Sequence, residues 1–294
     1  MTTEIYSIRN NTNPNKNGLS FLTTKELFLE ELRQFESVGF FAEKLSGMCY
    51  YCGEGNGIQS NDNSRLKSLI IKSTHKAYLF PLSDKNIIEN YQEDDLFDLI
   101  EFLNKYVSLP YFKSEDGSRI IPSFAKAYCN RGHYWHPENF DKEEGQDLFR
   151  IKINEILDHY SLSKPYQLRD GAIFIKAEAG LNNIIDAPLK TNNKTIKSKV
   201  DHSIKKYLGR NSTVADRVDA VRNLFDILED LKPQTKNLPF SKDESDLFNI
   251  ANNFSIRHHN KKQQNEYDPI WLSWMFYNCL SFIHVILHYP KKNE

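Results

Sequence analysis

The sequence predicts a mainly helical protein, α+β overall, with a mixed α/β N-terminal domain followed by a C-terminal four-helix bundle. Apolar residues recur at helical spacing throughout the C-terminal third, whereas strand and hairpin patterns occur before it. A segment with Pro188 and Asn192-Asn193, residues 186–194, separates the two patterns. We therefore expect a sensing or regulatory domain over residues 1–188 and a helical domain over residues 189–294.

Composition favours a soluble protein of the cytoplasm. Apolar residues make up 39% and charged residues 26% of the chain, which is typical of a folded globular protein. A formal net charge of −1 argues against a protein that coats nucleic acid by bulk electrostatics. The first residues do not form a basic-then-apolar signal, and four cysteines fit a reducing compartment better than a disulfide framework. We expect a cytoplasmic location.

The first elements of the N-terminal domain are predicted to be helical. Thr23–Glu26 matches a capping box that opens a helix, and we expect this helix to be interrupted near Gly39. Residues 66–80 fit either a pair of strands or a short helix followed by a strand. Residues 94–107 form an amphipathic pattern with an acidic start, which Pro110 is expected to stop.

Three further elements complete this domain. Ser114–Gly117 is a predicted turn, and residues 142–160 carry apolar side chains at helical spacing. Asp170-Gly171 lies between two apolar runs, which is a strong signal for a short β-hairpin.

The C-terminal domain is predicted to contain helices alone. Four are expected, over residues 195–208, 214–228, 241–254 and 270–289. The second should end before Pro233. Ser241–Glu244 matches a capping box for the third, and Asp268-Pro269 is a suitable N-cap and first-turn pair for the fourth.

The last predicted helix is apolar almost all round, which admits two interpretations. Its roughly twenty residues would suffice for a membrane span. However, polar residues would then lie in lipid: Ser273, Asn278, Ser281, His284 and His288. Burial in the bundle and at a dimer interface is the favoured interpretation, so no membrane partner is expected.

The residues most suited to chemistry stand before this helix. Arg257, His258 and His259 are consecutive, and Asn260, Lys261 and Lys262 follow them. Arginine holds phosphate oxygens in a planar fork, and histidine transfers protons near neutral pH. Cations at a helix C-terminus are also favoured by the helix dipole alone. These two interpretations remain open on the residues alone.

The arrangement resembles the HEPN family. A helical C-terminal region with an arginine and histidine cluster before its last helix looks like a HEPN domain, and upstream stretches are similar to bacterial abortive-infection proteins. Those stretches are Asp95–Leu103, Trp135-His136, Phe140-Asp141, Gly145-Gln146, Phe149-Arg150, Tyr166–Leu168 and Asp170–Ile173. The resemblance covers most of residues 94–290.

The resemblance implies a dimeric, metal-independent endoribonuclease of anti-phage defence that cuts RNA by attack of a ribose 2′-hydroxyl. Arg257 would bind the scissile phosphate, and His258 or His259 would act as base or acid. Asn260, Lys261 and Lys262 would contact the RNA. A regulatory protein partner is also implied, and no cofactor is required.

One position departs from the family's pattern. In the family, an arginine and a polar residue are followed by a histidine after a gap of four to six residues from the arginine. With Arg257 and His258 as the first two positions, that histidine would fall at residues 262–264, where this chain has Lys262, Gln263 and Gln264. His259, or a histidine of the second protomer, would have to take that role. The alternative is a non-catalytic HEPN module that binds a nucleotide or a partner protein within a defence complex.

Two other groups of residues could bind a metal or RNA. Cys49 and Cys52 have the spacing of a zinc knuckle, and Cys129 with His133 would complete four ligands of a structural zinc; a metal is not favoured. Five lysines cluster on the first bundle helix: Lys194, Lys197, Lys199, Lys205 and Lys206. A solvated face explains them better than an RNA-guiding surface.

Overall fold

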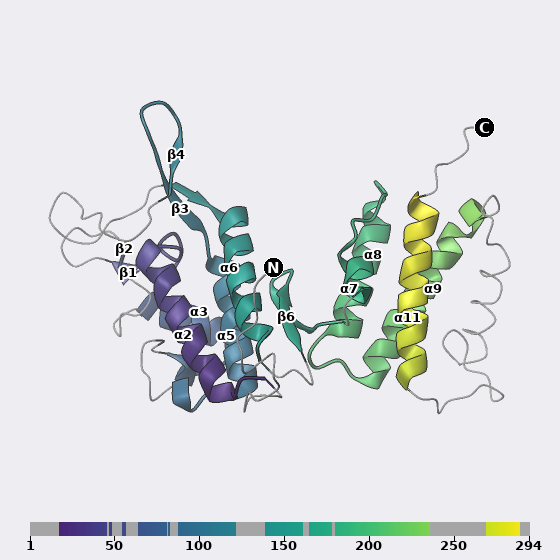
Figure 1. The fold of residues 1–294 in the computed structure, drawn as a ribbon, viewed down its shortest axis with the longest axis horizontal. Coiled ribbons are helices and arrows are strands. Elements are labelled where there is room, and N and C mark those ends of the chain that lie inside the picture. The colour runs from purple at the N-terminus through teal and green to yellow at the C-terminus, as the bar shows by residue number, and fades with distance from the viewer. Residues whose placement is uncertain are drawn as a thin grey trace, which may run out of the picture. The chain divides into compact units, whose positions relative to one another are not determined.

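The protein is mainly helical, with small antiparallel sheets, as predicted (Figure 1). The computed structural model describes residues 18–45, 47–48, 55–56, 64–80, 82, 88–121, 139–160, 165–177, 180–235 and 269–288. The chain divides into two compact units, Met1–Ile173 and Phe174–Glu294.

The first unit is built on four longer helices. They are α2 (Phe21–Val38), α3 (Ser64–Thr74), α5 (Glu93–Tyr106) and α6 (Lys142–Leu157). Helix α6 packs against both α2 and α5, and α3 packs against α5. The fully buried ring of Phe149 on α6 meets Phe35 and Phe41 edge-on, with ring centroids 5.2 and 6.3 Å away. Edge-to-face aromatic packing of this kind stabilises the core beyond simple burial.

Helix α2 begins earlier than the sequence pattern suggested. The N-cap is Ser20, whose hydroxyl accepts a hydrogen bond from the backbone of Thr23, so the predicted capping box at Thr23–Glu26 is wrong. Thr24 instead lies inside the helix and donates to the carbonyl of Ser20. The predicted interruption is confirmed, because Gly39 ends the helix at a φ of 93°, a conformation that glycine adopts without strain.

Residues 66–80 contain a helix rather than a strand pair. Helix α3 ends at Thr74, and His75 takes a φ of 59°. The hydroxyl of Thr74 accepts a hydrogen bond from the backbone of Lys76, and the 3-10 helix η1 (Ala77–Leu79) follows. The strand expected after the helix is therefore absent from this described stretch. Leu66 and Ile70, one turn apart on α3, are fully buried, which explains why the helix is stable here.

Helix α5 confirms the amphipathic pattern over residues 94–107. It carries a capping box between Gln92 and Asp95 and ends at Tyr106. Pro110 does not stop it, because the chain is already extended at Val107 and Pro110 lies inside strand β3.

The strands form small sheets. Strand β3 (Leu109–Lys113) lies between β4 (Arg119–Ile120) and β5 (Asn139–Asp141), antiparallel to both. The predicted turn at Ser114–Gly117 connects β3 to β4. Strands β1 (Gly47–Met48) and β2 (Gly55–Asn56) pair with each other, as do β6 (Tyr166–Arg169) and β7 (Ala172–Ile175). The β6–β7 hairpin turns at Asp170-Gly171, as predicted.

The second unit contains α7 (Leu181–Asp186), α8 (Lys194–Leu208), α9 (Val214–Thr235) and α11 (Pro269–His288). Helix α9 packs against both α8 and α11, and α7 packs against α11 (Figure 1). The sequence placed the domain boundary at residue 188, whereas the second unit begins at Phe174 and includes α7, which packs against α11. Helix α9 also continues through Pro233 instead of ending before it. Pro233 lies in the last turn, where a missing amide removes a single helical hydrogen bond.

Candidate functional site

The cluster predicted to carry catalysis lies outside the described residues. Arg257, His258 and His259, with Asn260, Lys261 and Lys262, all fall in the interval 236–268. The structure describes the two helices that flank this interval. Helix α9 ends at Thr235 and α11 begins at Pro269, and these two helices pack against each other. Both ends of the connection are therefore fixed within one packed unit.

The zinc candidates also lie outside the described residues: Cys49, Cys52, Cys129 and His133. Across the part of the chain that the structure describes, no three His, Cys, Asp or Glu side chains gather as a metal site would require.

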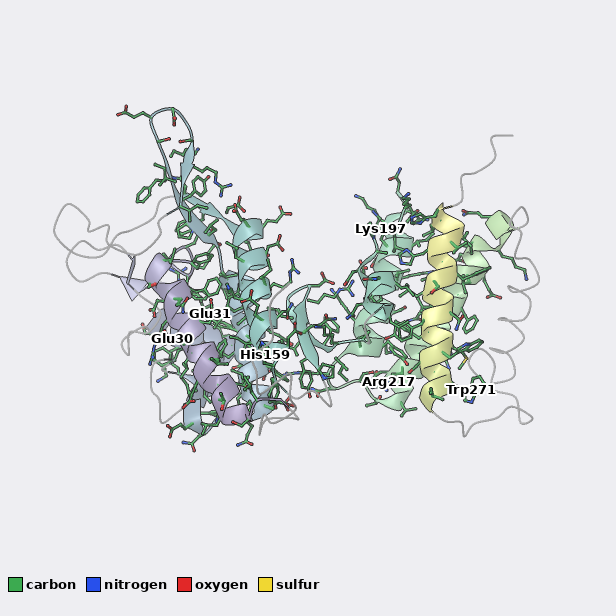
Figure 2. All side chains as sticks on the ribbon, viewed as in Figure 1. Glu30, Glu31, His159, Lys197, Arg217 and Trp271 are labelled. Atoms are coloured by element: carbon green, nitrogen blue, oxygen red, sulfur yellow. The ribbon has the colours of Figure 1, made fainter. Side chains whose placement is uncertain are left out.

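The lysines of α8 are spread along the helix rather than gathered at one point. Lys199 pairs with Asp230 at 3.1 Å, and Lys206 pairs with Asp219 at 3.0 Å. Lys197 is exposed and lies near one end of the helices, whereas Arg217 of α9 lies near the other end (Figure 2). Two of these lysines are thus paired with carboxylates of α9, and Arg257, on which an RNA-guiding surface would require the lysines to converge, lies outside the described residues.

A cavity of about 570 Å³ opens within the second unit. It is lined by the segment after β7, by α7, by the end of α8 and by the first turns of α9 and α11. The lining residues are Ile175, Lys176, Ala177, Leu181, Tyr207, Leu208, Arg217, Ile270, Ser273, Trp274, Tyr277 and Asn278. Most of these side chains are apolar or aromatic, a composition typical of a small-molecule site.

Tyr207 fixes one wall of this cavity. Its ring stacks on Phe276 of α11 with centroids 3.9 Å apart, and its hydroxyl donates a 2.9 Å hydrogen bond to Ser273. Burial raises the pKa of the Tyr207 phenol, although Ser273 and Arg217 oppose the shift. The phenol therefore stays protonated at neutral pH and acts as a hydrogen-bond donor.

The described lining carries two cations, Lys176 and Arg217, and Arg217 lies beside Tyr207. Its guanidinium carbon lies 5.7 Å from the centre of the Tyr207 ring, a cation–π contact. Its Nε atom is buried and has no hydrogen-bond partner among the described residues. A buried, unpaired donor on a permanently charged side chain is costly unless a ligand or another group satisfies it.

Helix ends add to the positive potential around Arg217. Arg217 stands in the first turns of α9, and Ile270 and Ser273 stand in the first turns of α11. Helix N-termini carry partial positive charge from the aligned backbone dipoles. The nearest acid along the chain, Asp216, accepts hydrogen bonds from the amide and hydroxyl of Thr213 instead. These contacts, the hydroxyl first, lower the pKa of Asp216.

The described lining residues suit binding rather than proton transfer. They offer a guanidinium, an ammonium, an amide, hydroxyls and flat rings, and none of the described ones is a histidine or carboxylate. The arrangement can hold an anionic group at Arg217 and an apolar body against the aromatic wall.

The polar residues of α11 are divided between this cavity and local contacts. Ser273 faces Tyr207, whereas Ser281 donates a 2.7 Å hydrogen bond to the carbonyl of Tyr277 one turn earlier. Burial lowers the pKa of His284, and the nearby His288 acts in the same direction. By length and composition, Ile270–His288 would suffice to cross a membrane, and 39% of that span is buried inside the protein.

A second cavity, of about 500 Å³, lies in the first unit. Two of its polar lining residues serve the fold: Glu101 accepts a 2.8 Å hydrogen bond from the backbone of Ile173, and Gln146 donates at 2.8 Å to the carbonyl of Asn104. These contacts tie α5 to β7 and to α6, so the cavity is a structural junction.

Arg217 was not singled out from the sequence, although a signal was present. Arg217, Val221, Leu224 and Leu228 follow one another at helical spacing, and the last three are fully buried. A charged residue on the packed face of a helix costs stability unless it has a partner, so it marks a candidate binding position.

The chain was compared with protein-family models, curated proteins and solved structures, and none of these comparisons found a match.

Proposed function

We propose that the second unit is a HEPN-like four-helix bundle and that the chain is a metal-independent endoribonuclease of bacterial anti-phage defence. The observation that carries the proposal is the packing of α9 against α11, the two helices that flank the Arg257–Asn260 cluster. An arginine and two histidines in a connection anchored at both ends are suited to act together on one phosphate.

The proposed cleavage requires three groups. One histidine removes the proton from the ribose 2′-hydroxyl, whose oxygen then bonds to the adjacent phosphorus. Arg257 stabilises the negative charge on the phosphate oxygens. The bond from phosphorus to the 5′-oxygen breaks, and the second histidine donates a proton to that oxygen. The products are a 2′,3′-cyclic phosphate and a 5′-hydroxyl, and no metal takes part.

The proposal also covers the location, the oligomeric state and the regulation of the protein. The protein would act in the cytoplasm as a homodimer through its helical bundle, with α11 at or near the interface. Exposed aromatic side chains on α11, Trp271 and Trp274, are consistent with such a contact. The first unit would sense or regulate, through a partner protein.

The test is RNA cleavage by the full chain in the presence of a metal chelator. Wild type should release 2′,3′-cyclic phosphate ends, and Arg257→Ala, His258→Ala or His259→Ala should lose about 100-fold or more in rate. His202→Ala is the matched control, because His202 is an exposed histidine of α8. Expression of wild type should also slow cell growth more than expression of the variants. Equal cleavage by wild type and Arg257→Ala would refute the proposal.

The second candidate function is a non-catalytic HEPN-like module that binds a nucleotide or a partner protein. The presence of Lys262, Gln263 and Gln264 where the family has a histidine favours it. RNA that is bound but not cut, with binding weakened by Arg257→Ala, would support this candidate over the first.

A further inference from the structure

We propose that the cavity lined by Arg217, Tyr207 and Trp274 binds a small aromatic carboxylate. The site lies apart from the predicted catalytic residues in sequence, and the proposal does not depend on RNA cleavage. It rests on the size of the cavity, the chemistry of its walls and the environment of Arg217.

The volume and the lining of the cavity indicate the uncharged part of the ligand. A cavity of about 570 Å³ lies within the range of small-molecule sites. Leu181, Leu208 and Ile270 supply aliphatic surface, and Trp274 and Tyr277 supply flat rings. Apolar and aromatic surfaces of this kind favour a ring system over a sugar or a polar chain.

The environment of Arg217 indicates which charged group the ligand carries. The buried Nε of Arg217 has no hydrogen-bond partner in the described part of the chain. Its guanidinium is a planar fork that matches the two oxygens of a carboxylate. The Tyr207 ring lies against this guanidinium and restricts its orientation. A bound carboxylate would thus pair with a positioned donor set rather than with a free surface arginine.

A hydroxyl supplies a second contact. Ser273 accepts the hydrogen bond of Tyr207 through its oxygen, and among the described residues its own proton has no acceptor, so it can be donated to a ligand oxygen. The amide nitrogen of Asn278, by contrast, donates to the carbonyl of Trp274 at 2.7 Å. Arg217 and Ser273 are therefore the polar groups that we assign to the carboxylate, and Trp274 and Tyr277 are the rings that we assign to the aromatic body.

Charge balance favours a carboxylate over a phosphate. A phosphate dianion would need a second positive charge beside Arg217 to compensate its desolvation. The other described cation of the lining is Lys176, and it has an interaction of its own. A monoanion matches the single charge of Arg217. Nucleotides are thus the competing ligands that the experiment must separate from carboxylates.

The experiment is calorimetric titration of the full chain, without RNA, with 2-naphthoate, its neutral analogue 2-naphthamide, and adenosine monophosphate. We expect naphthoate to bind at least tenfold more tightly than naphthamide, because an ionic hydrogen bond is lost in the amide. Arg217→Gln should weaken naphthoate binding about tenfold or more and leave naphthamide binding unchanged. Lys197→Gln, the removal of an exposed cation of α8, should have no effect.

Arg217→Lys is a second variant, which keeps the positive charge and removes the planar guanidinium with its paired hydrogen-bond donors. It should weaken naphthoate binding less than Arg217→Gln does, and circular dichroism should show that both variants are folded. The proposal is overturned if naphthoate does not bind wild type, binds no better than its amide, or binds Arg217→Gln and Arg217→Lys as well as wild type. It is also overturned if adenosine monophosphate binds more tightly than naphthoate. None of these readouts changes if the chain proves unable to cleave RNA.

Discussion

The hydroxyl of Tyr207 donates a 2.9 Å hydrogen bond to the hydroxyl of Ser273, and the Tyr207 ring stacks on Phe276 one turn further along α11. The buried side chain of Tyr207 thereby joins α8 to α11, and α9 packs against both helices. The same tyrosine forms the wall against which Arg217 lies. Tyr207 thus contributes both to the contact between α8 and α11 and to the wall of the cavity.

Removal of the Tyr207 hydroxyl should weaken the second unit modestly. Tyr207→Phe keeps the stacked ring and loses one hydrogen bond, so we expect a loss of about 1 kcal/mol in the free energy of unfolding. Urea unfolding followed by tryptophan fluorescence is the suitable measurement, because Trp271 and Trp274 both stand on α11.

Ser273→Ala should cost a similar amount, and the double variant should cost less than the sum, because both single changes remove the same bond. Ser198→Ala, an exposed serine of α8, is the control. Strict additivity of Tyr207→Phe and Ser273→Ala would show that the bond contributes nothing.

Asp95 should make the stability of the first unit depend on acid pH. Its carboxyl accepts hydrogen bonds from Lys76 Nζ at 2.7 Å and from the Tyr78 hydroxyl at 2.7 Å. The backbone amide of Gln92 donates to it as well, at 2.9 Å. Burial alone would raise the pKa of Asp95, but these contacts, led by Lys76, lower it.

A carboxyl whose pKa is lower in the folded state stabilises the protein above its unfolded pKa, near 4, and loses that contribution as the pH falls through the folded value. Asp95→Asn should therefore cost about 2 kcal/mol at pH 7, less than for a fully buried ion pair, because Lys76 is partly exposed. The difference between wild type and variant should shrink below about pH 4.

Hydrogen exchange of the α5 backbone, measured by mass spectrometry over this pH range, separates the first unit from the second. Asp98→Asn is the matched control, because Asp98 also pairs with Lys76, at 2.8 Å, but is more exposed. A gap between wild type and Asp95→Asn that stays constant from pH 7 to acid would contradict the assignment.

Gly145 is required by close packing and not by backbone conformation. It lies within α6, and a Cβ at this position would stand 2.7 Å from backbone carbons of Ser108 and would clash with the amide of Leu109. Alanine favours helix formation by about 1 kcal/mol over glycine. Gly145→Ala should nevertheless destabilise the first unit by about 3 kcal/mol, because the clash is with rigid backbone.

Thermal unfolding followed by circular dichroism tests this, with Asp147→Ala on the exposed side of α6 as the control. Increased stability of Gly145→Ala would show that α6 does not approach the chain before β3 this closely.

The sequence predicts individual helices and hairpins better than it predicts features that depend on tertiary contacts. The amphipathic periods of α5, α6 and α8 and the Asp170-Gly171 hairpin are local patterns, so they could be placed without knowledge of the fold. The start of α2 could not, because Thr23 with Glu26 fits a capping box locally, whereas the N-cap in the structure is Ser20, one turn earlier. Residues 66–80 were ambiguous because a short apolar run fits either period.

The two candidate sites, the cavity around Arg217 and the Arg257-His258-His259 cluster, also differ in how far the sequence alone predicts them. The cavity is formed by side chains from four helices and one extended segment, so no stretch of sequence contains it. Arg217 carried a local signal, a charge on an apolar helix face, but its pairing with Tyr207 depends on the packing of α9 against α8. The Arg257-His258-His259 cluster is the converse case. Its chemistry is evident from the sequence, and it remains a prediction that the RNA cleavage assay tests.

The β6–β7 hairpin gives the last prediction. Asp170 and Gly171 both have positive φ, 49° and 79°, as the two central residues of a type I′ turn must. Gly171→Ala should destabilise the hairpin by about 1 to 2 kcal/mol, since a left-handed conformation strains any residue with a Cβ. The added carbon would also lie 3.3 Å from the side-chain nitrogen of Asn104.

Asp170→Asn is the matched control and should change stability by less than about 0.5 kcal/mol, because asparagine tolerates the same conformation. Hydrogen exchange of β6 and β7 distinguishes the two: faster exchange in Gly171→Ala alone is expected, and equal exchange in both variants would rule out a type I′ turn at this position.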